Sequence, residues 1–115
     1  MKMKKATLAL LVLGFIIFGF ISAIPAGSYT IIVYGTEYCG YTRAMRHDLD
    51  GEKYLYSYYD VNKDESKNEE MWKKVRLVCP TCELSGSVKI PVMDLNGQVY
   101  IRPSFEEVKK IIGNP

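Results

Sequence analysis

Apolar and polar positions follow patterns that predict two strands and two helices in the first half of the domain. Residues 29–34 form an almost continuous apolar run, which is typical of a strand buried on both faces. Residues 54–60 are rich in aromatic side chains at every second position, as in a second strand. Residues 40–49 and 65–78 repeat apolar residues at helical spacing. This order indicates a parallel strand pair joined by a right-handed crossover.

The apolar residues of each predicted helix define the face that packs on the sheet. These residues are Ala44, Met45 and Leu49 on the first helix, and Met71, Trp72, Val75 and Val78 on the second. We expect Gly51 to end the first helix as its C-terminal cap. Asp64 or Ser66 is expected to cap the start of the second helix.

The last part of the chain predicts a hairpin and a final helix. Residues 92–95 and 98–101 are apolar runs separated by Asn96-Gly97, the strongest short signal for a tight turn. Pro103-Ser104 then opens a helix. The inner face of this helix comprises Phe105, Val108, Ile111 and Ile112. The order βαβαββα indicates an α/β fold with helices on both faces of a four-stranded mixed sheet.

A hydrophobic segment precedes this domain. Three lysines lie within the first five residues, and residues 6–26 then contain no charge. A charge-free stretch of about 20 residues can cross a bilayer as a helix. We therefore predict that residues 1–26 are a secretory signal or, slightly favoured, an uncleaved membrane anchor, with the lysines in the cytoplasm. The domain of residues 27–115 would lie outside the cytoplasm, membrane-anchored or secreted.

The charge and cysteine content narrow the function. Setting aside the three N-terminal lysines leaves 12 of the 15 basic side chains against 13 acidic ones, so the domain is nearly neutral. No basic stripe suggests nucleic-acid binding. Three cysteines leave an odd one, and an exported chain is permitted disulfides. The simplest account is one disulfide and one reactive thiol.

Cys39 is the candidate reactive thiol. It follows the first strand and Gly35, and it falls at or just before the first turn of the next helix. Backbone N–H groups lack partners there and the helix dipole is positive, so the pKa of Cys39 should fall below the free value of about 8.5. Arg43, one turn on, adds a cation on the same side. The alternative is an inert, buried cysteine.

Three short segments resemble the glutaredoxin family of the thioredoxin-like superfamily. They are Val33-Tyr34-Gly35-Thr36, Cys39-Gly40-Tyr41-Thr42 and Lys89-Ile90-Pro91-Val92. The resemblance covers about residues 29 to 112 and implies a thioredoxin-like fold. In the family the active site is Cys-Pro-Tyr-Cys, or Cys-Gly-Phe-Ser in the monothiol branch. The resemblance therefore implies a monothiol-like site in which Cys39 attacks.

The resemblance also assigns roles to residues around Cys39. In thioredoxin-like folds a cis-proline sits opposite the active cysteine, and the backbone of the preceding residue pairs with the bound peptide or glutathione. Pro91 and Ile90 match these positions, although a trans proline on an edge strand remains an alternative. The candidate catalytic residues are Cys39, Thr42 and Arg43. The candidate substrate-binding residues are Tyr38, Tyr41, Ile90 and Pro91.

A second cysteine motif departs from the family pattern. Residues 79–87 look like an insertion that carries Cys79-Pro80-Thr81-Cys82. Two cysteines at this spacing can close a disulfide, act as a redox pair or supply half a metal site. We rank a structural or regulatory disulfide first. A partner that resolves a mixed disulfide on Cys39 comes second, since Cys82 closely precedes Ile90, and metal binding comes third.

We therefore expect an enzyme, a thiol–disulfide oxidoreductase that forms a mixed disulfide on Cys39 outside the cytoplasm. In the family, glutathione often releases the product. Here the glutathione-binding pattern is incomplete, because no lysine lies in the first strand or in the loop before Cys39, and Arg102-Pro103-Ser104 replaces the Gly-Gly or Gly-Asp that usually follows the hairpin. No cofactor is then required. The expected partner is a disulfide-containing protein or a small thiol.

Two alternatives from other functional classes remain. The monothiol branch holds an iron–sulfur cluster between two subunits with glutathione, and Cys79 and Cys82 could add thiolates to a metal site. An oxidising compartment and the missing glutathione contacts count against this cluster. The other alternative is a non-catalytic binding module in which Cys39 is buried and the second motif forms a structural disulfide.

Overall fold

The computed structural model describes residues 28–115 of the chain. The predicted N-terminal helix, its role as signal or anchor, and the domain boundary after residue 26 lie outside the described residues. Within residues 28–115, no helix combines the length and the apolar character needed to span a membrane.

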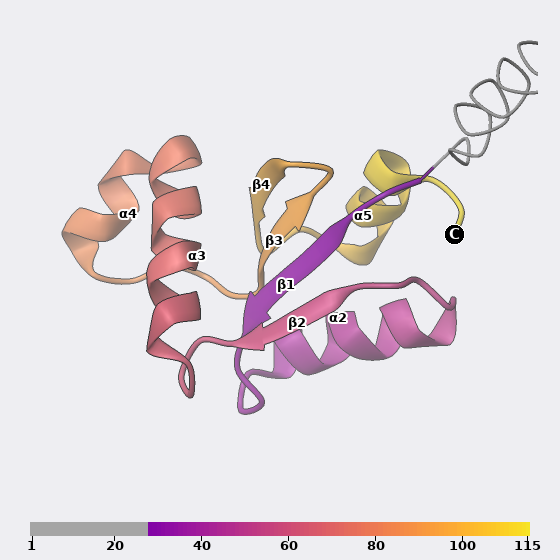
Figure 1. Cartoon of the computed structure of the whole chain (residues 1–115), viewed down its shortest axis with the longest axis horizontal. Coiled ribbons are helices and arrows are strands. Elements are labelled where there is room, and N and C mark those ends of the chain that lie inside the picture. The colour runs from indigo at the N-terminus through magenta and orange to yellow at the C-terminus, as the bar shows by residue number, and fades with distance from the viewer. Residues whose placement is uncertain (1–27) are drawn as a thin grey trace, which may run out of the picture.

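A mixed sheet of four strands forms the centre of the domain (Figure 1). The strands are β1 (Ile31–Gly35), β2 (Ser57–Asp60), β3 (Val92–Leu95) and β4 (Gln98–Ile101), in the order β2-β1-β3-β4. β1 pairs in parallel with β2 and antiparallel with β3, which pairs antiparallel with β4. The hairpin between β3 and β4 turns at Asn96 and Gly97, both at positive φ, as predicted from this dipeptide.

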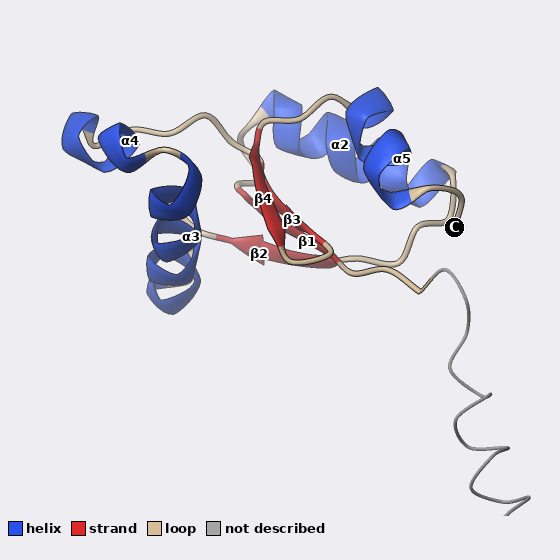
Figure 2. Cartoon of the chain, turned by 90° about the horizontal axis from the view of Figure 1, so that it is seen from above, coloured by secondary structure: helices blue, strands red, loops and turns tan. Residues whose placement is uncertain are grey.

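Helices lie on both faces of this sheet (Figure 2). α2 (Gly40–Gly51) and α5 (Phe105–Ile112) pack on one face. α3 (Glu65–Val78) packs on the other face, with the short helix α4 (Pro80–Ser85) beside it. The predicted α/β architecture with its four-stranded mixed sheet is confirmed. The additional helix α4 occupies the segment that the sequence marked as an insertion.

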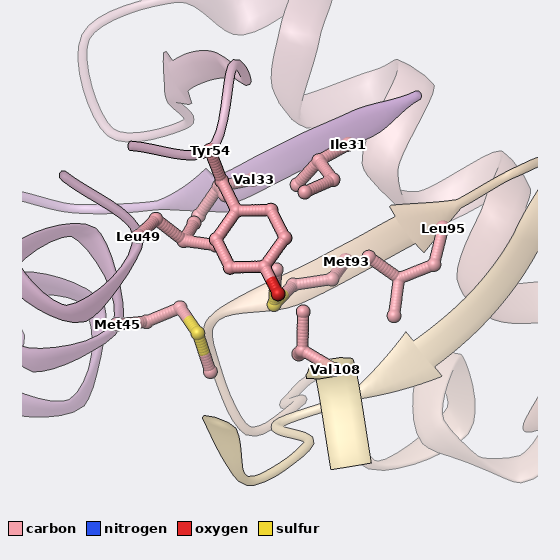
Figure 3. Close-up of a cluster of buried hydrophobic side chains, with 8 residues drawn as sticks. All are labelled: Ile31, Val33, Met45, Leu49, Tyr54, Met93, Leu95 and Val108. Atoms are coloured by element: carbon pink, nitrogen blue, oxygen red, sulfur yellow. The ribbon is translucent and has the colours of Figure 1, made fainter. Parts of the chain in front are cut away.

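Two apolar clusters hold the helices on the sheet. Side chains alternate along β1, so Ile31 and Val33 face α2 and α5, whereas Tyr34 faces α3. The first cluster comprises Ile31, Val33, Met45, Leu49, Tyr54, Met93, Leu95 and Val108, whose side chains point toward one another in Figure 3. The second cluster comprises Tyr34, Met71, Val75 and Val92.

The caps of α3 and α5 explain why these two helices have their predicted starts. The Asp64 side chain accepts a 3.1 Å hydrogen bond from the Lys67 N–H at the start of α3. The Ser104 hydroxyl accepts a 3.1 Å hydrogen bond from the Glu107 N–H at the start of α5. Each bond satisfies one of the N–H groups that a helix leaves without a partner.

Three details of the predicted helices are wrong. Ala44 is exposed, because the buried stripe of α2 runs through Thr42, Met45 and Leu49. Gly51 is the last residue of α2 rather than its cap, and the left-handed position that ends the helix falls on Lys53, at φ 63°. Val78 is half exposed, because it is the last residue of α3, where the chain turns into α4.

β1 and β2 begin later than predicted because the backbone ahead of them bonds elsewhere. Thr30 exchanges hydrogen bonds with Asn96, in the hairpin turn, rather than with a neighbouring strand. The Tyr54 N–H donates to the Leu49 carbonyl, and the Leu55 N–H donates to the Tyr29 hydroxyl. These residues are therefore excluded from the strand ladders, although Tyr54 still belongs to the first apolar cluster.

Candidate active site

Cys39 lies at the N-cap of α2, directly after the loop that leaves β1. Its own N–H donates to the Thr36 carbonyl at 3.2 Å, and its carbonyl accepts the first helical hydrogen bond from Arg43 at 3.0 Å. The side chain is partly buried and makes no disulfide. The helix start thus holds a free thiol at its positive end.

The surroundings of Cys39 favour its thiolate. Partial burial opposes ionisation, but the backbone N–H and hydroxyl of Thr42, the backbone N–H of Tyr41 and the charge of Arg102 outweigh it and lower the pKa of Cys39. The neutral thiol makes no capping hydrogen bond and donates to the Ile90 carbonyl instead, at 3.7 Å. The N–H groups at the helix start therefore act mainly on the ionised sulfur.

Thr42 is placed to support that sulfur from within the core. Its side chain is fully buried, and its hydroxyl has no hydrogen-bond partner among the described residues. A donor without a partner can turn to the thiolate when Cys39 ionises. Gly35 permits this position, because a Cβ at Gly35 would collide with the Thr42 side chain. The close approach of β1 to α2 thus depends on a glycine.

The Ile90–Pro91 peptide bond is cis, and it faces Cys39. Pro91 is buried, so the bend that it makes is fixed within the fold. The carbonyl of Ile90 reaches the Cys39 sulfur from a segment far away in sequence. The structure therefore brings together three of the predicted site residues, Cys39, Ile90 and Pro91.

Arg102, directly after β4, binds the same Ile90 carbonyl as the Cys39 thiol. Its Nε donates to the Ile90 carbonyl at 2.8 Å, and its backbone N–H donates to the Pro91 carbonyl at 2.8 Å. The guanidinium group stacks over the ring of Tyr41, 3.9 Å from the ring centre. Arg102 therefore connects the cis-proline bend to the helix that carries Cys39.

A cavity of about 380 Å³ opens beside these residues. Six of its lining residues are Tyr41, Met45, Pro91, Arg102, Ser104 and Phe105. Asp48 and Glu107 add two carboxyl groups to the same lining. Cys39 does not line the cavity, but Tyr41, Pro91 and Arg102 form its wall on the side of the sulfur. A group bound in this cavity would contact Tyr41, Pro91 and Arg102, the residues that the cavity shares with the surroundings of Cys39.

The site can be compared with known proteins. A family model described as Glutaredoxin matches residues 31–100, which is more than half of the chain. The chain belongs to the glutaredoxin family. The resemblance carried by three short sequence segments is therefore confirmed.

Solved structures agree with this fold. The crystal structure of a mutant of the thioredoxin-like protein BC3987 superposes with a TM-score of 0.56 and 19% identity, over 75% of this chain and 97% of that chain. The glutaredoxin from Archaeoglobus fulgidus superposes with a TM-score of 0.54 and 19% identity, over 76% of this chain and 90% of that chain. No curated protein sequence matches the chain significantly. The two superpositions show that this chain has the thioredoxin-like fold.

The remaining predicted residues of this glutaredoxin site lie at its rim. Tyr38 and Tyr41 are 76% and 62% exposed. Arg43 is also exposed, and it donates a 3.0 Å hydrogen bond to the Glu37 carbonyl in the loop before Cys39. The charge that lowers the pKa of Cys39 comes from Arg102 rather than from this neighbour.

The second cysteine motif lies apart from Cys39. Cys79 and Cys82 form a disulfide with each other, and both pack against the apolar cluster beneath α3. Figure 2 shows α4 beside α3, away from α2 and α5. The structure therefore contains a Cys79–Cys82 disulfide, the first of the three arrangements predicted for this motif. A role of these cysteines in releasing a product from Cys39 stays a prediction.

No group of three or more His, Cys, Asp or Glu side chains in residues 28–115 is arranged to hold a metal ion. A cluster shared between two subunits stays a prediction, because a single chain does not test it. The residue that sequence analysis missed is Arg102. Arg102 stands where the family usually has Gly-Gly or Gly-Asp, and a positive side chain directly after the last strand is the sequence signal that points to it.

Proposed function

We propose that this glutaredoxin-family protein is a thiol–disulfide oxidoreductase with Cys39 as its attacking thiol. One observation carries the proposal. A free thiol with a lowered pKa lies 3.7 Å from the Ile90 carbonyl, which precedes a cis-proline. A partly exposed thiol that ionises readily can meet a substrate disulfide and attack it.

The reaction at Cys39 proceeds in two exchanges. The Cys39 thiolate attacks one sulfur of a substrate disulfide, the S–S bond breaks, and the second substrate sulfur leaves as a thiolate that takes up a proton. An incoming thiolate then attacks the substrate sulfur of the mixed disulfide and releases Cys39. In sum, one substrate sulfur is released as a thiol, and the other ends in a mixed disulfide with the incoming thiol. A second incoming thiol then attacks that mixed disulfide, so the substrate becomes a dithiol and the two incoming thiols become one disulfide.

The cavity favours a polypeptide substrate. Asp48 and Glu107 place two carboxyl groups in its lining, and these oppose an anionic small thiol such as glutathione. The Arg102 guanidinium already donates to Ile90 and stacks on Tyr41. Apolar surfaces of Tyr41, Met45 and Phe105 remain for the side chains that flank a substrate cysteine.

We propose that the domain acts outside the cytoplasm. Three lysines followed by the charge-free residues 6–26 support export with or without a retained anchor. A disulfide between Cys79 and Cys82 fits an oxidising compartment.

The test uses the variant Cys79→Ser/Cys82→Ser, in which Cys39 is the only cysteine left. Because the pKa of Cys39 is lowered, the thiolate persists as the pH falls, so alkylation by iodoacetamide should reach half its maximal rate below pH of about 8.5. The same protein should exchange with a fluorescent peptide disulfide. A midpoint above pH of about 9, or no exchange, would favour an inert binding module.

Arg102→Met tests whether the charge of Arg102 lowers the pKa of Cys39. Loss of its charge should slow alkylation at pH 7 by roughly threefold to tenfold and move the midpoint to higher pH. Arg43→Met is the matched control, because it removes an arginine bound to the Glu37 carbonyl. An equal effect of both variants would show that Arg102 has no special position.

A further inference from the structure

The disulfide between Cys79 and Cys82 occupies an unusual place in the chain. Cys79 ends α3 and immediately precedes α4, whose first residue is Pro80. Its N–H donates to the Val75 carbonyl at 2.7 Å, and its carbonyl accepts from the Cys82 N–H at 3.1 Å. These backbone bonds already fix the turn between the helices. The two sulfurs are thus brought together by local structure.

This disulfide is a weaker structural cross-link than one that closes a long loop. It closes a loop between residues only three apart, and the entropy removed from an unfolded chain falls as the closed loop shortens. It joins two helices that are consecutive in sequence, and α4 has no buried residue for it to hold in a core. An ion pair of Arg76 with Glu83 also connects α3 to α4. A different role is therefore indicated.

The disulfide is accessible to solvent, and exposed apolar residues lie on both sides of it in the sequence. Cys79 and Cys82 are both partly exposed. Leu77 and Val78, directly before Cys79, are 79% and 50% exposed, and Leu84, two residues after Cys82, is 87% exposed. Within residues 28–115 the other large apolar side chains so exposed are Tyr38 and Tyr41, which flank Cys39, and Leu55. Exposed apolar side chains thus lie near both sulfur sites in the sequence.

We propose that Cys79 and Cys82 form a second thiol–disulfide exchange site, which is reduced by a dithiol protein that docks on Leu77, Val78 and Leu84. The site works independently of Cys39, because it lies beside α3, whereas Cys39 is the N-cap of α2, which packs on the other face of the sheet (Figure 2). It therefore goes beyond the proposed exchange at Cys39.

The exchange needs two electrons, which the partner dithiol supplies. One partner thiolate attacks the Cys82 sulfur, the Cys79–Cys82 bond breaks, and Cys79 leaves as a thiolate that takes up a proton. The Thr81 hydroxyl lies 3.8 Å from the Cys79 sulfur and can donate to the departing thiolate. The second partner thiol then attacks the mixed disulfide. Cys82 is released as a thiol, and the partner becomes a disulfide.

The test uses Cys39→Ser, in which the pair is the only source of thiol chemistry. Dithiothreitol serves as the dithiol probe, and thiols are counted over time in the folded protein and in the protein unfolded by urea. An accessible exchange site should be reduced at rates that agree within roughly tenfold in the two states. Reduction more than tenfold slower in the folded protein would overturn the proposal, since the bond would then open only on unfolding.

Trp72 provides an independent readout. It is the only tryptophan of the chain and packs in the same cluster as both cysteines, so its fluorescence should change on reduction and recover on reoxidation. Trp72→Phe and the variant without cysteines are the controls. The far-ultraviolet circular dichroism of Cys39→Ser should stay unchanged on reduction. Loss of this helical signal would instead mark the disulfide as a structural cross-link. Because Cys39 is absent, these results are separate from those for its proposed reaction.

Discussion

The Thr42 hydroxyl lowers the stability of the fold and favours the thiolate form of Cys39. Its hydroxyl is buried without a partner, and such a group lowers stability because it loses its hydrogen bonds to water. The same hydroxyl lowers the pKa of Cys39 by donating to the thiolate. The two effects have opposite signs, so one substitution can separate them.

Thr42→Val removes the hydroxyl and keeps the shape of the side chain. We expect the free energy of unfolding to rise by about 1 kcal/mol, since the buried unsatisfied group is gone. The pKa of Cys39 should rise at the same time, so alkylation at pH 7 should slow by roughly threefold. Urea unfolding and the pH profile of alkylation measure the two effects, both in the Cys79→Ser/Cys82→Ser background.

Thr42→Ser is the matched control for this pair of effects. It keeps the hydroxyl and loses one methyl group from the core, so it should destabilise the protein by about 1 kcal/mol. The pH profile of alkylation should be the same as in the parent protein, which has Thr42. If Thr42→Val destabilised the protein or left the profile unchanged, the hydroxyl would have neither assigned role.

A single site residue could be found from the sequence where its role depends on residues close to it in the chain. Cys39 could be predicted because its position follows from a strand, a loop and a helix start that adjoin it. Arg102 could not, because its role depends on contacts with Tyr41 and Ile90, which only the folded sheet brings together. Arg43 was favoured as the nearest cation in sequence, yet its side chain bonds to Glu37 instead.

At the scale of elements, a polar network joins α3 to the sheet beside the second apolar cluster. The Lys74 ammonium donates to the Asp94 carboxylate at 2.8 Å and to the Tyr34 hydroxyl at 2.7 Å, and Tyr34 donates to Glu70. Burial and then the bond to Glu70 raise the pKa of Tyr34, so it stays protonated. Asp94 also accepts from the Gly97 N–H in the hairpin turn. One lysine thus connects α3, β1 and β3.

Lys74→Met should break this network and destabilise the fold by about 3 kcal/mol, because Asp94 would keep a buried, unpaired charge. Lys73→Met is the matched control on the exposed side of α3 and should change stability by less than about 0.5 kcal/mol. Urea unfolding at pH 7 measures both. Equal stabilities of the two variants would contradict the role of Lys74.

The pH dependence of the same network has a definite sign. The hydrogen bond from Tyr34 is the main cause that lowers the pKa of Glu70. A carboxyl group whose pKa is lowered on folding stabilises the protein above its unfolded pKa, and this contribution is lost as the pH falls through the folded value. The network should therefore weaken below pH of about 4.

The bounds of helices and strands were predicted correctly where local side-chain chemistry sets them. The Asn96-Gly97 turn and the caps at Asp64 and Ser104 fix their elements within a few residues, so β3, β4, α3 and α5 could be predicted closely. The short helix α4 was missed because it buries no residue and so has no apolar period. The start of β2 was misjudged because Tyr54 and Leu55 bond to residues outside the sheet.

At the scale of the whole molecule, the sheet separates two sulfur centres. Cys39 is the N-cap of α2, which packs on one face, whereas Cys79 and Cys82 belong to the cluster on the other face. The segment after α4 leads to Ile90, whose carbonyl contacts the Cys39 sulfur, so the chain connects the centres without bringing the sulfurs together. Exposed apolar side chains flank each centre. This arrangement fits separate partners better than an internal transfer.

The last prediction tests that separation. Wild type and Cys79→Ser/Cys82→Ser are fully reduced, freed of reductant and mixed with a peptide disulfide, and the peptide bound to Cys39 is quantified by mass spectrometry. With the peptide disulfide in excess, both proteins should accumulate the mixed disulfide on Cys39 equally, because Cys79 and Cys82 belong to the cluster on the other face of the sheet. An added thiol should release the peptide at rates that agree within about twofold. Accumulation in the double variant alone would instead show that Cys79 or Cys82 moves across the fold to release the product.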